Sequence, residues 1–318
     1  MKAPAFWYRP FGLCAALLMP FGRVYEMAAE IRRAFARPYR AAIPVICVGN
    51  VVAGGAGKTP TALALARLLQ QTGAQPVFVT RGYGGMEAGP LRVDPDRHSA
   101  RDVGDEALLL ACAAPCWIGR DRAAAIRAAA PQATHIILDD GLQNPTIAPS
   151  VKLCVIDGAT GLGNGAIIPA GPLREDFIEA TKRLDAVIVI GALARPLPFA
   201  RKIPVLQAQL TSALSDDFPR DGAFLAFAGI GRPAKFYASC REAGLALAVT
   251  KDFPDHHLFT PPELAALAEQ AKAQNLRLIT TAKDWVRLPD AFRAQVAVLP
   301  VTLTFEDEAA LKRVIRTA

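Results

Sequence analysis

"GNVVAGGAGKTPTALALARLL", residues 49–69, ends like a phosphate-binding loop that leads into a helix. The common spacing of such loops, G-x-x-x-x-G-K-[ST], requires a glycine five positions before Gly57, and this chain has Val52 there. The surroundings fit nevertheless, because a β-rich run at residues 44–50 precedes the loop and an alanine-rich helical pattern follows it. In that context backbone N–H groups and a helix N-terminus point at an anion. The sequence therefore predicts a phosphate site, against the alternative of an ordinary glycine-rich turn.

Six residues of this loop are expected to bind a nucleotide: Gly54, Gly55, Ala56, Gly57, Lys58 and Thr59. Glycines allow the backbone to approach the phosphates closely. The Lys58 ammonium is expected to reach the β- and γ-phosphates, and the Thr59 hydroxyl to ligate Mg²⁺. Pro60 is compatible with the first helical turn, where its missing N–H would be unpaired in any case.

A second feature lies at the end of the buried run "HIILDD", residues 135–140. In phosphate-loop folds, an acid at the end of a neighbouring strand faces the loop and holds the metal shell. One strand-end aspartate alone is equally well explained as a turn residue. Two adjacent acids beside a GKT loop indicate a metal and phosphate site, so Asp139 and Asp140 are predicted metal residues.

The chain lacks the diagnostic residues of two other classes of phosphate-loop protein. A guanine-specific G protein would carry N-K-x-D after a strand, whereas "TTAKD" has Lys283 and Asp284 adjacent. A partitioning-type ATPase that rides on membranes would carry a lysine directly before the glycine pair, and Ala53 occupies that position. Both classes are therefore disfavoured.

Short β-rich runs alternate with helical patterns along most of the chain, which predicts parallel sheets with right-handed crossovers. We expect an α/β fold with a larger phosphate-loop domain at residues 41–205, built on a mainly parallel sheet, and a smaller α/β domain at 206–318. The proline-rich segment 194–204 is expected to connect them. The last helical pattern, residues 306–317, begins with acids and ends with bases, as the helix dipole favours. It could pack on either domain.

The net charge of the 318-residue chain is +7, and most of it is concentrated at the N-terminus. Residues 1–40 hold seven basic and two acidic residues, hence +5, which leaves +2 for the remaining 278. Because the basic charge is local, a broad nucleic-acid footprint is not expected. The six cysteines form no C-x-x-C pair, so most are predicted to be reduced core residues.

The N-terminal segment, residues 1–40, contains an apolar run of 11 residues from Phe11 to Phe21, with aromatic residues before it and arginines after it. A signal peptide would need a small-residue cleavage site, and "MPFGRVYE" offers none. A core helix and an interfacial helix are the remaining interpretations. The aromatic and basic flanks favour an interfacial helix whose arginines contact anionic headgroups. The run is shorter than the roughly 20 residues that span a bilayer.

Several stretches together resemble one family. They are "VGNVVAGGAGKTP", "TRGYGG", "VGDEALLL", "DDGLQ", "GLGNGAIIPAGPLRE", "AFAGIGRPAKF", "FPDHH" and "TTAKDWVRL". In this order they are similar to the tetraacyldisaccharide 4′-kinases, which phosphorylate the 4′-hydroxyl of a tetraacyl glucosamine disaccharide 1-phosphate with MgATP in lipid A biosynthesis. The resemblance implies a kinase domain, a smaller C-terminal α/β domain and an N-terminal membrane-associated helix. It also implies a loop without the first glycine, so Val52 is no objection.

The resemblance also assigns two catalytic residues. Asp105 of "VGDE" matches the family's catalytic aspartate, with the expected role of accepting the sugar hydroxyl proton, and His256 of "FPDHH" matches the histidine that pairs with it. A hydroxyl nucleophile needs a base at its proton, and a partner that orients the base. On spacing alone, Asp105 is better explained as a helix N-cap or first-turn acid, and His256 as a loop histidine near Asp255; only the resemblance favours catalytic roles.

Further residues are implied around the phosphates. Metal binding is expected at Thr59, Asp139, Asp140 and Glu175, and substrate or phosphate binding at Arg81, Tyr83, Arg122, Gln143 and Arg174. Arg81 and Tyr83 follow a strand, where parallel sheets bind ligands. The chain departs from the family pattern at Leu142 and Asn144 of "DDGLQN", and at Ala282 of "TTAKD".

The expected function is therefore transfer of phosphate from ATP to a lipid disaccharide. The expected partners are ATP with Mg²⁺, the acylated disaccharide 1-phosphate and, through residues 1–40, a membrane surface; no nucleic acid is expected. The expected location is peripheral, on the cytoplasmic face of the inner membrane. A membrane-surface ATPase that acts on a protein partner is the alternative, and it would not need Asp105 or His256.

Overall fold

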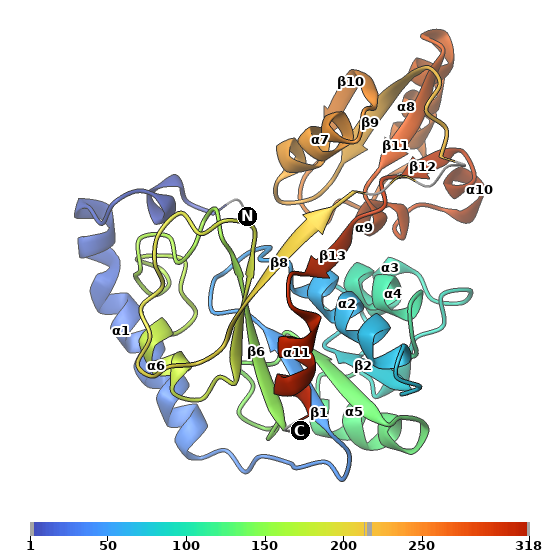
Figure 1. The fold of residues 1–318 in the computed structure, drawn as a ribbon. Helices are drawn as coiled ribbons and strands as arrows, with labels where there is room; N and C mark the ends of the chain where they lie inside the picture. The colour runs from blue at the N-terminus through green and yellow to red at the C-terminus, as the bar shows by residue number, and fades with distance from the viewer. Residues whose placement is uncertain (1–2, 213, 215–217, 317–318) are drawn as a thin grey trace.

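The computed structural model describes residues 3–212, 214 and 218–316, which form two lobes (Figure 1). Within the described residues the larger lobe holds a nine-stranded sheet in the order β13-β8-β7-β6-β1-β5-β2-β4-β3. Its strands are β1 (Val45–Gly49), β2 (Pro76–Thr80), β3 (Leu91–Arg92), β4 (Cys116–Ile118), β5 (His135–Asp139), β6 (Val151–Asp157), β7 (Ala186–Ile190), β8 (Val205–Thr211) and β13 (Thr302–Phe305). All neighbours pair in parallel except the two edge strands β3 and β13.

Helices cover both faces of this sheet, because its central strands alternate apolar side chains between two cores. Ile46 and Val48 of β1 join the core under α2 (Lys58–Gln70), α4 (Asp105–Ala111) and α11 (Glu308–Ile315). Val45 and Cys47 of the same strand join the opposite core, under α5 (Arg122–Ala129). The neighbouring core on that side includes Phe177 of α6 (Phe177–Thr181). Buried on both faces, β1 is a rigid support for the loop that follows it.

The smaller lobe is a separate α/β layer of about residues 218–299. Its parallel strands are arranged as β10-β9-β11-β12, with bounds β9 (Ala223–Ala228), β10 (Ala246–Asp252), β11 (Leu276–Thr280) and β12 (Val296–Val298). Helix α7 (Pro233–Glu242) packs on one face and α8 (Pro261–Ala273) on the other. The short helices α9 (Ala282–Trp285) and α10 (Asp290–Arg293) follow β11.

The observed division between the lobes differs from the predicted boundary at residues 205 and 206. Strand β8 pairs with β7 in the larger sheet, and β13 returns from the smaller lobe to pair with β8. Figure 1 shows both strands leading between the lobes. Leu311 and Ile315 of the last helix, α11, are buried in the larger lobe. The chain thus leaves the larger lobe after residue 211 and re-enters it at residue 302.

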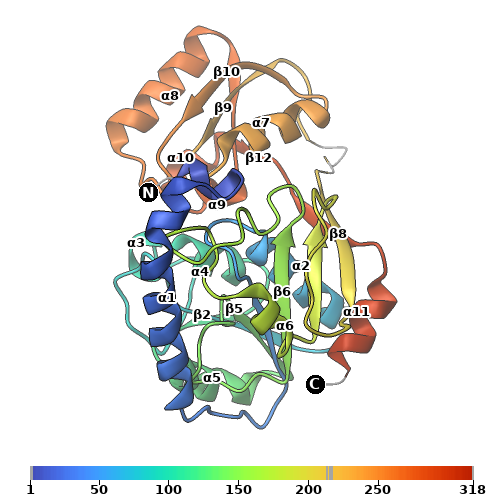
Figure 2. The same cartoon turned by 90° about the vertical axis from the view of Figure 1, so that its left-hand side faces the viewer.

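The N-terminal segment forms a short 3-10 turn, η1 (Ala5–Tyr8), and a 22-residue helix, α1 (Leu13–Ala34), along the outside of the larger lobe (Figure 2). Its buried residues are Ala15 and Gly22, so the alternative of a core helix is wrong. Eight large apolar side chains of α1 are exposed: Leu13, Leu17, Met19, Phe21, Val24, Tyr25, Met27 and Ile31. Among the described residues, no helix has the length and apolarity to cross a membrane.

Helix α1 is nevertheless held on the larger lobe at three places. The Trp7 indole donates to the Pro169 carbonyl at 3.0 Å, just before the helix. A Cβ on Gly22 would lie 3.0 Å from the Ile167 carbonyl oxygen, so the helix passes close to that backbone. Near the other end, Arg33 forms an ion pair with Glu175 at 3.0 Å.

The cysteines are reduced, as predicted. Cys47, Cys116, Cys154 and Cys240 are buried in the cores, whereas Cys14 and Cys112 are exposed.

Candidate active site between the two lobes

The phosphate loop follows β1 and ends at the N-terminus of α2. Gly54 and Gly57 have φ angles of +109° and +89°, in the region that favours glycine. A Cβ on Gly57 would lie 2.3 Å from Cδ1 of Ile190, so the position also lacks room for a side chain. The first N–H groups of α2 have no partner within the helix and are available to an anion. The geometry fits the predicted phosphate site.

Val52, at the position of the missing glycine, is part of the core. It is buried and forms an isolated bridge with Leu173. The next residue, Ala53, donates its N–H to the Pro172 carbonyl at 2.7 Å, and the Arg174 N–H donates to the Val51 carbonyl at 2.7 Å. The segment around residues 172–174 therefore fixes the first half of the loop, and a buried valine suits that position better than a glycine.

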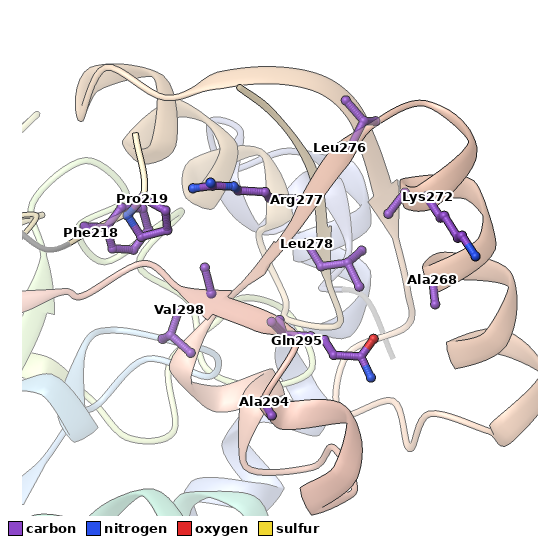
Figure 3. Close-up of a pocket in the computed structure, with 13 residues that line it drawn as sticks. Phe218, Pro219, Ala268, Lys272, Leu276, Arg277, Leu278, Ala294, Gln295 and Val298 are labelled. Carbon is purple, nitrogen blue, oxygen red and sulfur yellow. The ribbon is translucent and has the colours of Figure 1, made fainter. Parts of the chain in front are cut away.

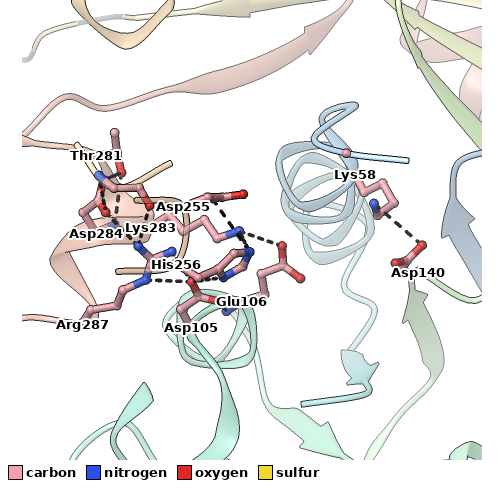
Figure 4. A network of polar contacts seen from close by, with 12 residues as sticks. Lys58, Asp105, Glu106, Asp140, Asp255, His256, Thr281, Lys283, Asp284 and Arg287 are labelled. Carbon is pink, nitrogen blue, oxygen red and sulfur yellow. Dashed lines mark hydrogen bonds and ion pairs between the residues drawn. The ribbon is translucent and has the colours of Figure 1, made fainter. Parts of the chain in front are cut away.

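Lys58 and Asp140 lie close together at the phosphate loop. The Lys58 Nζ lies 3.7 Å from Oδ1 of Asp140 (Figure 4). It also lies 3.4 Å from Oδ1 of Asn50. Arg174 donates to the same Asp140 oxygen at 2.9 Å. Burial raises the pKa of Asp140, but the charges of Lys58 and Arg174 outweigh it and hold the pKa below its ordinary range. Asp140 is thus an anion held between two cations.

Asp139, the neighbouring acid, has no such partner. Its side chain is buried, with 1% of the residue exposed, and neither carboxylate oxygen has a hydrogen-bond partner. Burial and the nearby charge of Glu106 raise its pKa to about 7. A buried acceptor without a donor is costly, and a cation would satisfy it. Among the described residues there is no cluster of three or more His, Cys, Asp or Glu side chains that could hold a metal alone. This fits Mg²⁺, which binds one or two carboxylates together with waters and substrate phosphates.

Glu175 is not placed to join Asp139. Its carboxylate receives hydrogen bonds from Arg33 at 3.0 Å, from Gln143 at 2.8 Å, and from Arg183. Gln143 donates also to the Asn50 carbonyl, at 2.9 Å. The expected metal role of Glu175 therefore does not agree with the structure. Glu175 and Gln143 instead connect α1 to the strand end that carries the phosphate loop.

Asp105 and His256 meet between the lobes, although 151 positions separate them in the chain. Asp105 is the first residue of α4 in the larger lobe, and His256 lies in the loop after β10 with φ at +59°. The His256 Nδ1 is 3.0 Å from Oδ2 of Asp105, and its Nε2 is 3.4 Å from the Lys283 Nζ. An ammonium only donates and a carboxylate accepts, so these partners assign the proton to Nδ1 and leave a lone pair on Nε2.

The carboxylate of Asp105 is already fully engaged. Its Oδ1 accepts the Glu106 N–H at 2.8 Å, and its Oδ2 accepts Nε of Arg287 at 2.8 Å together with Nη2. Burial raises the pKa of Asp105, but the His256 hydrogen bond and the charges of Lys283 and Arg287 hold it far below its ordinary range. Such a carboxylate is a weak base, whereas the imidazole side chain is 36% exposed. The geometry therefore favours His256 as the base and Asp105 as the group that orients it, the reverse of the expected roles.

The residues expected to bind the substrate differ in their exposure to solvent. Arg81 and Tyr83 are both exposed, and the Tyr83 ring meets the His256 ring edge-on at 5.9 Å between centroids. Arg122 is buried instead and donates to the Gly119 carbonyl at 3.0 Å. It is thus less suited than Arg81 to hold a lipid phosphate.

Several polar residues at the site were missed at the level of sequence. Lys283 donates to Glu106 at 3.0 Å, and Arg287 reaches Asp105 from the smaller lobe (Figure 4). Arg232, also in the smaller lobe, donates to the Gly55 carbonyl of the phosphate loop and to Asp157, each at 2.8 Å. Lys283 and Arg287 both belong to the motif "TTAKDWVRL", from which no residue was predicted to join the site.

A hollow of about 790 Å³ on the smaller lobe contains none of the predicted site residues (Figure 3). It is lined mainly by side chains of α8, β11, β12 and the segment before β9, among them Phe218, Leu276 and Leu278. A second hollow, of about 580 Å³, lies on the larger lobe and is lined by Arg37, Tyr39, Arg120 and Arg127 among others. The second is basic and borders the segment that follows α1.

The comparisons with known proteins point in one direction. A family model described as tetraacyldisaccharide-1-P 4′-kinase matches residues 14–318. A relative from Methylobacterium nodulans, named tetraacyldisaccharide 4′-kinase, is 50% identical over 330 residues, which cover 98% of this chain and 95% of the relative. One of the same name from Parvibaculum lavamentivorans is 51% identical over 308 residues, covering 92% and 88%. A crystal structure described as the "apo" form of LpxK from Aquifex aeolicus in complex with ATP matches with a TM-score of 0.79 and 25% identity, covering 96% of this chain and 99% of that one.

Proposed function

Because the chain belongs to the tetraacyldisaccharide-1-P 4′-kinase family, we propose that its interlobe site transfers the γ-phosphoryl group of ATP to the 4′-hydroxyl of a tetraacyl disaccharide 1-phosphate. The family resemblance, the α/β fold, the kinase activity and ATP as a ligand, all predicted from the sequence, agree with the comparisons. A membrane-surface ATPase acting on a protein partner would not need an Asp–His pair beside the phosphate loop, and we do not retain it.

The observation that carries the mechanism is the contact of Asp105 with Nδ1 of the His256 ring, whose Nε2 lies toward Lys283. Asp105 fixes the other ring nitrogen at 3.0 Å, so the lone pair of Nε2 has a defined direction. In the proposed mechanism Nε2 accepts the proton of the 4′-hydroxyl as the oxygen attacks the γ-phosphorus, the bond from the γ-phosphorus to the β,γ-bridging oxygen breaks and ADP leaves. Asp105 stabilises the imidazolium that forms. Lys283, which now lies near Nε2, moves toward the transferred phosphoryl group.

The other half of the mechanism is positioning and charge stabilisation, which dominate phosphoryl transfer. The loop N–H groups and Lys58 hold the β- and γ-phosphates. When bound, Mg²⁺ would neutralise charge on the same phosphates. Thr59, Asp139 and Asp140 would hold it, because they lie at the loop and because the Asp139 oxygens lack a protein donor. The charges of Glu106 and Lys283 act on Asp139, which indicates that the two halves of the site adjoin.

The membrane supplies the substrate in this proposal. The exposed apolar side of α1 would lie among the headgroups, with arginines of residues 1–40 on anionic lipids, at the cytoplasmic face of the inner membrane. Each basic residue near such a surface contributes about 1 kcal/mol, so high salt should weaken attachment. The basic hollow at Arg37, Arg120 and Arg127 borders this segment and suits the substrate's 1-phosphate.

The test is incubation of the full chain with labelled ATP, Mg²⁺ and the tetraacyl disaccharide 1-phosphate in detergent micelles. Label should appear on the lipid and depend on Mg²⁺. Hydrolysis of ATP without label on the lipid would contradict the proposal. A His256→Gln variant that still labels the lipid at the parent rate would contradict the assigned base.

A further inference from the structure

Arg287 is the most deeply buried cation of the site. Its side chain is 1% exposed and lies between the lobes, where it contacts both. In the larger lobe Nε and Nη2 donate to Oδ2 of Asp105. In the smaller lobe Nη1 donates to Oδ1 of Asp284 at 2.8 Å and to the Gly229 carbonyl at 2.9 Å. All three of its nitrogens are therefore used, by acceptors on two lobes.

The Gly229 carbonyl connects Arg287 to the histidine. It accepts the backbone N–H of His256 at 3.0 Å as well as Nη1 of Arg287. His256 has a left-handed backbone, which a non-glycine residue adopts only when its surroundings hold it. One guanidinium thus fixes the carboxylate of the dyad directly and supports the backbone that presents the imidazole.

Asp284 holds the guanidinium in turn. This carboxylate is fully buried, at 0% exposure, and accepts the Gly229 N–H at 3.0 Å and the Thr281 hydroxyl at 2.7 Å. With Arg287 its hydrogen-bonding capacity is satisfied on both oxygens. The orientation of the guanidinium is therefore set inside the smaller lobe before it reaches Asp105.

We propose that Arg287, oriented by Asp284, is the positioning residue that assembles the Asp105–His256 pair from two lobes. The inference rests on the proposed function of that pair. A planar fork with donors on three nitrogens can contact Asp105, Asp284 and Gly229 together, whereas a lysine ammonium cannot reach the three acceptors in one plane. Lys283 does not substitute for Arg287, because it is engaged with Glu106 and His256 on the other side of the ring.

The test compares the same change at two arginines. Arg287→Lys keeps the charge but loses the fork, and Arg293→Lys is the matched control. Arg293 lies in the same lobe, pairs with Asp290 at 2.7 Å and stacks on Trp285, without contact to the dyad. For Arg287→Lys we expect kcat to fall on the order of 10²-fold, within the range for a displaced general base, with the KM for MgATP within about threefold of the parent. The kcat and the KM for MgATP of Arg293→Lys should both lie within about twofold of the parent values.

Chemical rescue gives a second measurement. Arg287→Ala should lose more activity than Arg287→Lys. Ethylguanidinium at tens of millimolar should raise the kcat of Arg287→Ala at least about tenfold, since the space left by the side chain is still lined by the acceptors of Asp105, Asp284 and Gly229. Circular dichroism and a cooperative melt come first. Should Arg287→Ala fail to fold, Arg287→Lys alone decides. An Arg287→Lys variant within threefold of the parent kcat would overturn the proposal, and so would a folded Arg287→Ala variant without rescue.

A third measurement does not depend on the reaction. The chain has four histidines, so the ¹⁵N-histidine spectrum of the parent is simple and His256→Gln assigns its resonances. His256 should show a protonated Nδ1 and an unprotonated Nε2 in the parent and in Arg293→Lys, and a mixture of tautomers in Arg287→Lys. An unchanged His256 signature in Arg287→Lys would overturn the positioning role. If the parent failed to phosphorylate the disaccharide, the proposed function would fail, yet this spectrum would still decide the role of Arg287.

Discussion

The phosphate side and the dyad side of the site are constructed differently. On the phosphate side, Asn50, Lys58, Asp140 and Arg174 all belong to the larger lobe and contact one another there. On the dyad side, Asp105 belongs to the larger lobe, whereas His256 and Arg287 belong to the smaller one. The phosphate side is therefore built from the larger lobe, with Arg232 contacting its loop from the smaller lobe, whereas the dyad exists only where the two lobes meet.

The difference separates what each side contributes. A site within one rigid lobe can bind nucleotide regardless of the smaller lobe's position. The dyad is assembled only when the two lobes are docked as in this structure. Phosphoryl transfer can therefore be lost while ATP binding persists. Changes on the dyad side should act on kcat, and changes on the phosphate side should act on nucleotide binding as well.

The largest effect is expected from His256→Ala, which removes the dyad base and leaves the phosphate side intact. We expect kcat to fall about 10²–10⁴-fold, the usual contribution of a general base, with ATP affinity nearly unchanged. Stopped reactions with labelled ATP and equilibrium nucleotide binding measure the two quantities. If Asp105 acts only through His256, the Asp105→Asn, His256→Ala double variant should be little worse than His256→Ala alone. A double loss equal to the product of the single losses would show that the two residues act independently.

Lys58→Ala breaks the other side of the comparison. The loss of one fixed cation at the phosphates should lower kcat/KM for ATP on the order of 10²–10³-fold. The tautomer of His256 should stay as in the parent, because Lys58 does not contact the dyad. Kinetics and equilibrium nucleotide binding measure the loss at the phosphates, and the histidine spectrum measures the tautomer of His256. Near-normal turnover by a folded Lys58→Ala protein would rule out the nucleotide role of the loop.

The exposed side of α1 should matter only when the substrate is in a bilayer. Leu17 and Phe21 are 68% and 63% exposed, so Leu17→Gln with Phe21→Gln should leave the fold intact. We expect sedimentation with anionic vesicles and turnover of vesicle-embedded substrate to fall at least about fivefold, since burying two large side chains contributes about 3–6 kcal/mol at most. Turnover in detergent micelles should change less. Val301→Gln, at an exposed apolar position near β13, is the control. Vesicle binding equal to the parent's would place the membrane-binding surface elsewhere.

Asp139→Asn should stabilise the protein while it damages the reaction. Burial raises the pKa of Asp139 from its ordinary value to about 7, so the folded state binds a proton that the unfolded state releases between about pH 4 and 7. Without Mg²⁺, stability should therefore fall as the pH rises through this window. Asparagine carries no charge, so the variant should melt about 2–6 °C above the parent at pH 8 and match it at pH 4. Equal melting temperatures of the variant and the parent at pH 8 would contradict a raised pKa of Asp139.

The smallest effect is expected at the contact that links the two sides. Arg232 joins the smaller lobe to Gly55 and Asp157, but its side chain is partly exposed, and such ion pairs contribute little. Arg232→Ala should raise the KM for ATP about two- to fivefold with kcat within twofold. An effect as large as that of Lys58→Ala would mean that the phosphate side depends on the smaller lobe after all.

The same difference explains what the sequence could and could not predict. The phosphate loop and the Asp139–Asp140 pair are contiguous motifs, so their spacing indicates their chemistry directly. The Asp105–His256 pair came from the family resemblance, and its contact with Arg287 spans 182 positions, which no local pattern reveals. The donors that engage the Asp105 carboxylate, which favour an orienting role over the expected role of base, are visible only in three dimensions. The alternation of strands and helices predicted two α/β units, but it does not say which sheet a strand joins, so β8 and β13 were not placed.

Helix α1 is fixed to the larger lobe through Trp7, Gly22 and Arg33, so it cannot change its depth independently of the site. With the exposed side of α1 at the height of the headgroups, and with the lobes joined at Asp105, the imidazole of His256 would stand at a constant distance above the acyl chains. The height of the base above the bilayer would then select which substrate hydroxyl reacts. A hydroxyl at the height of the second sugar would meet the base, whereas one nearer to or farther from the chains would miss it. Selection of the phosphorylated position would in this way follow from how the helix is attached, in addition to the groups that surround the sugar.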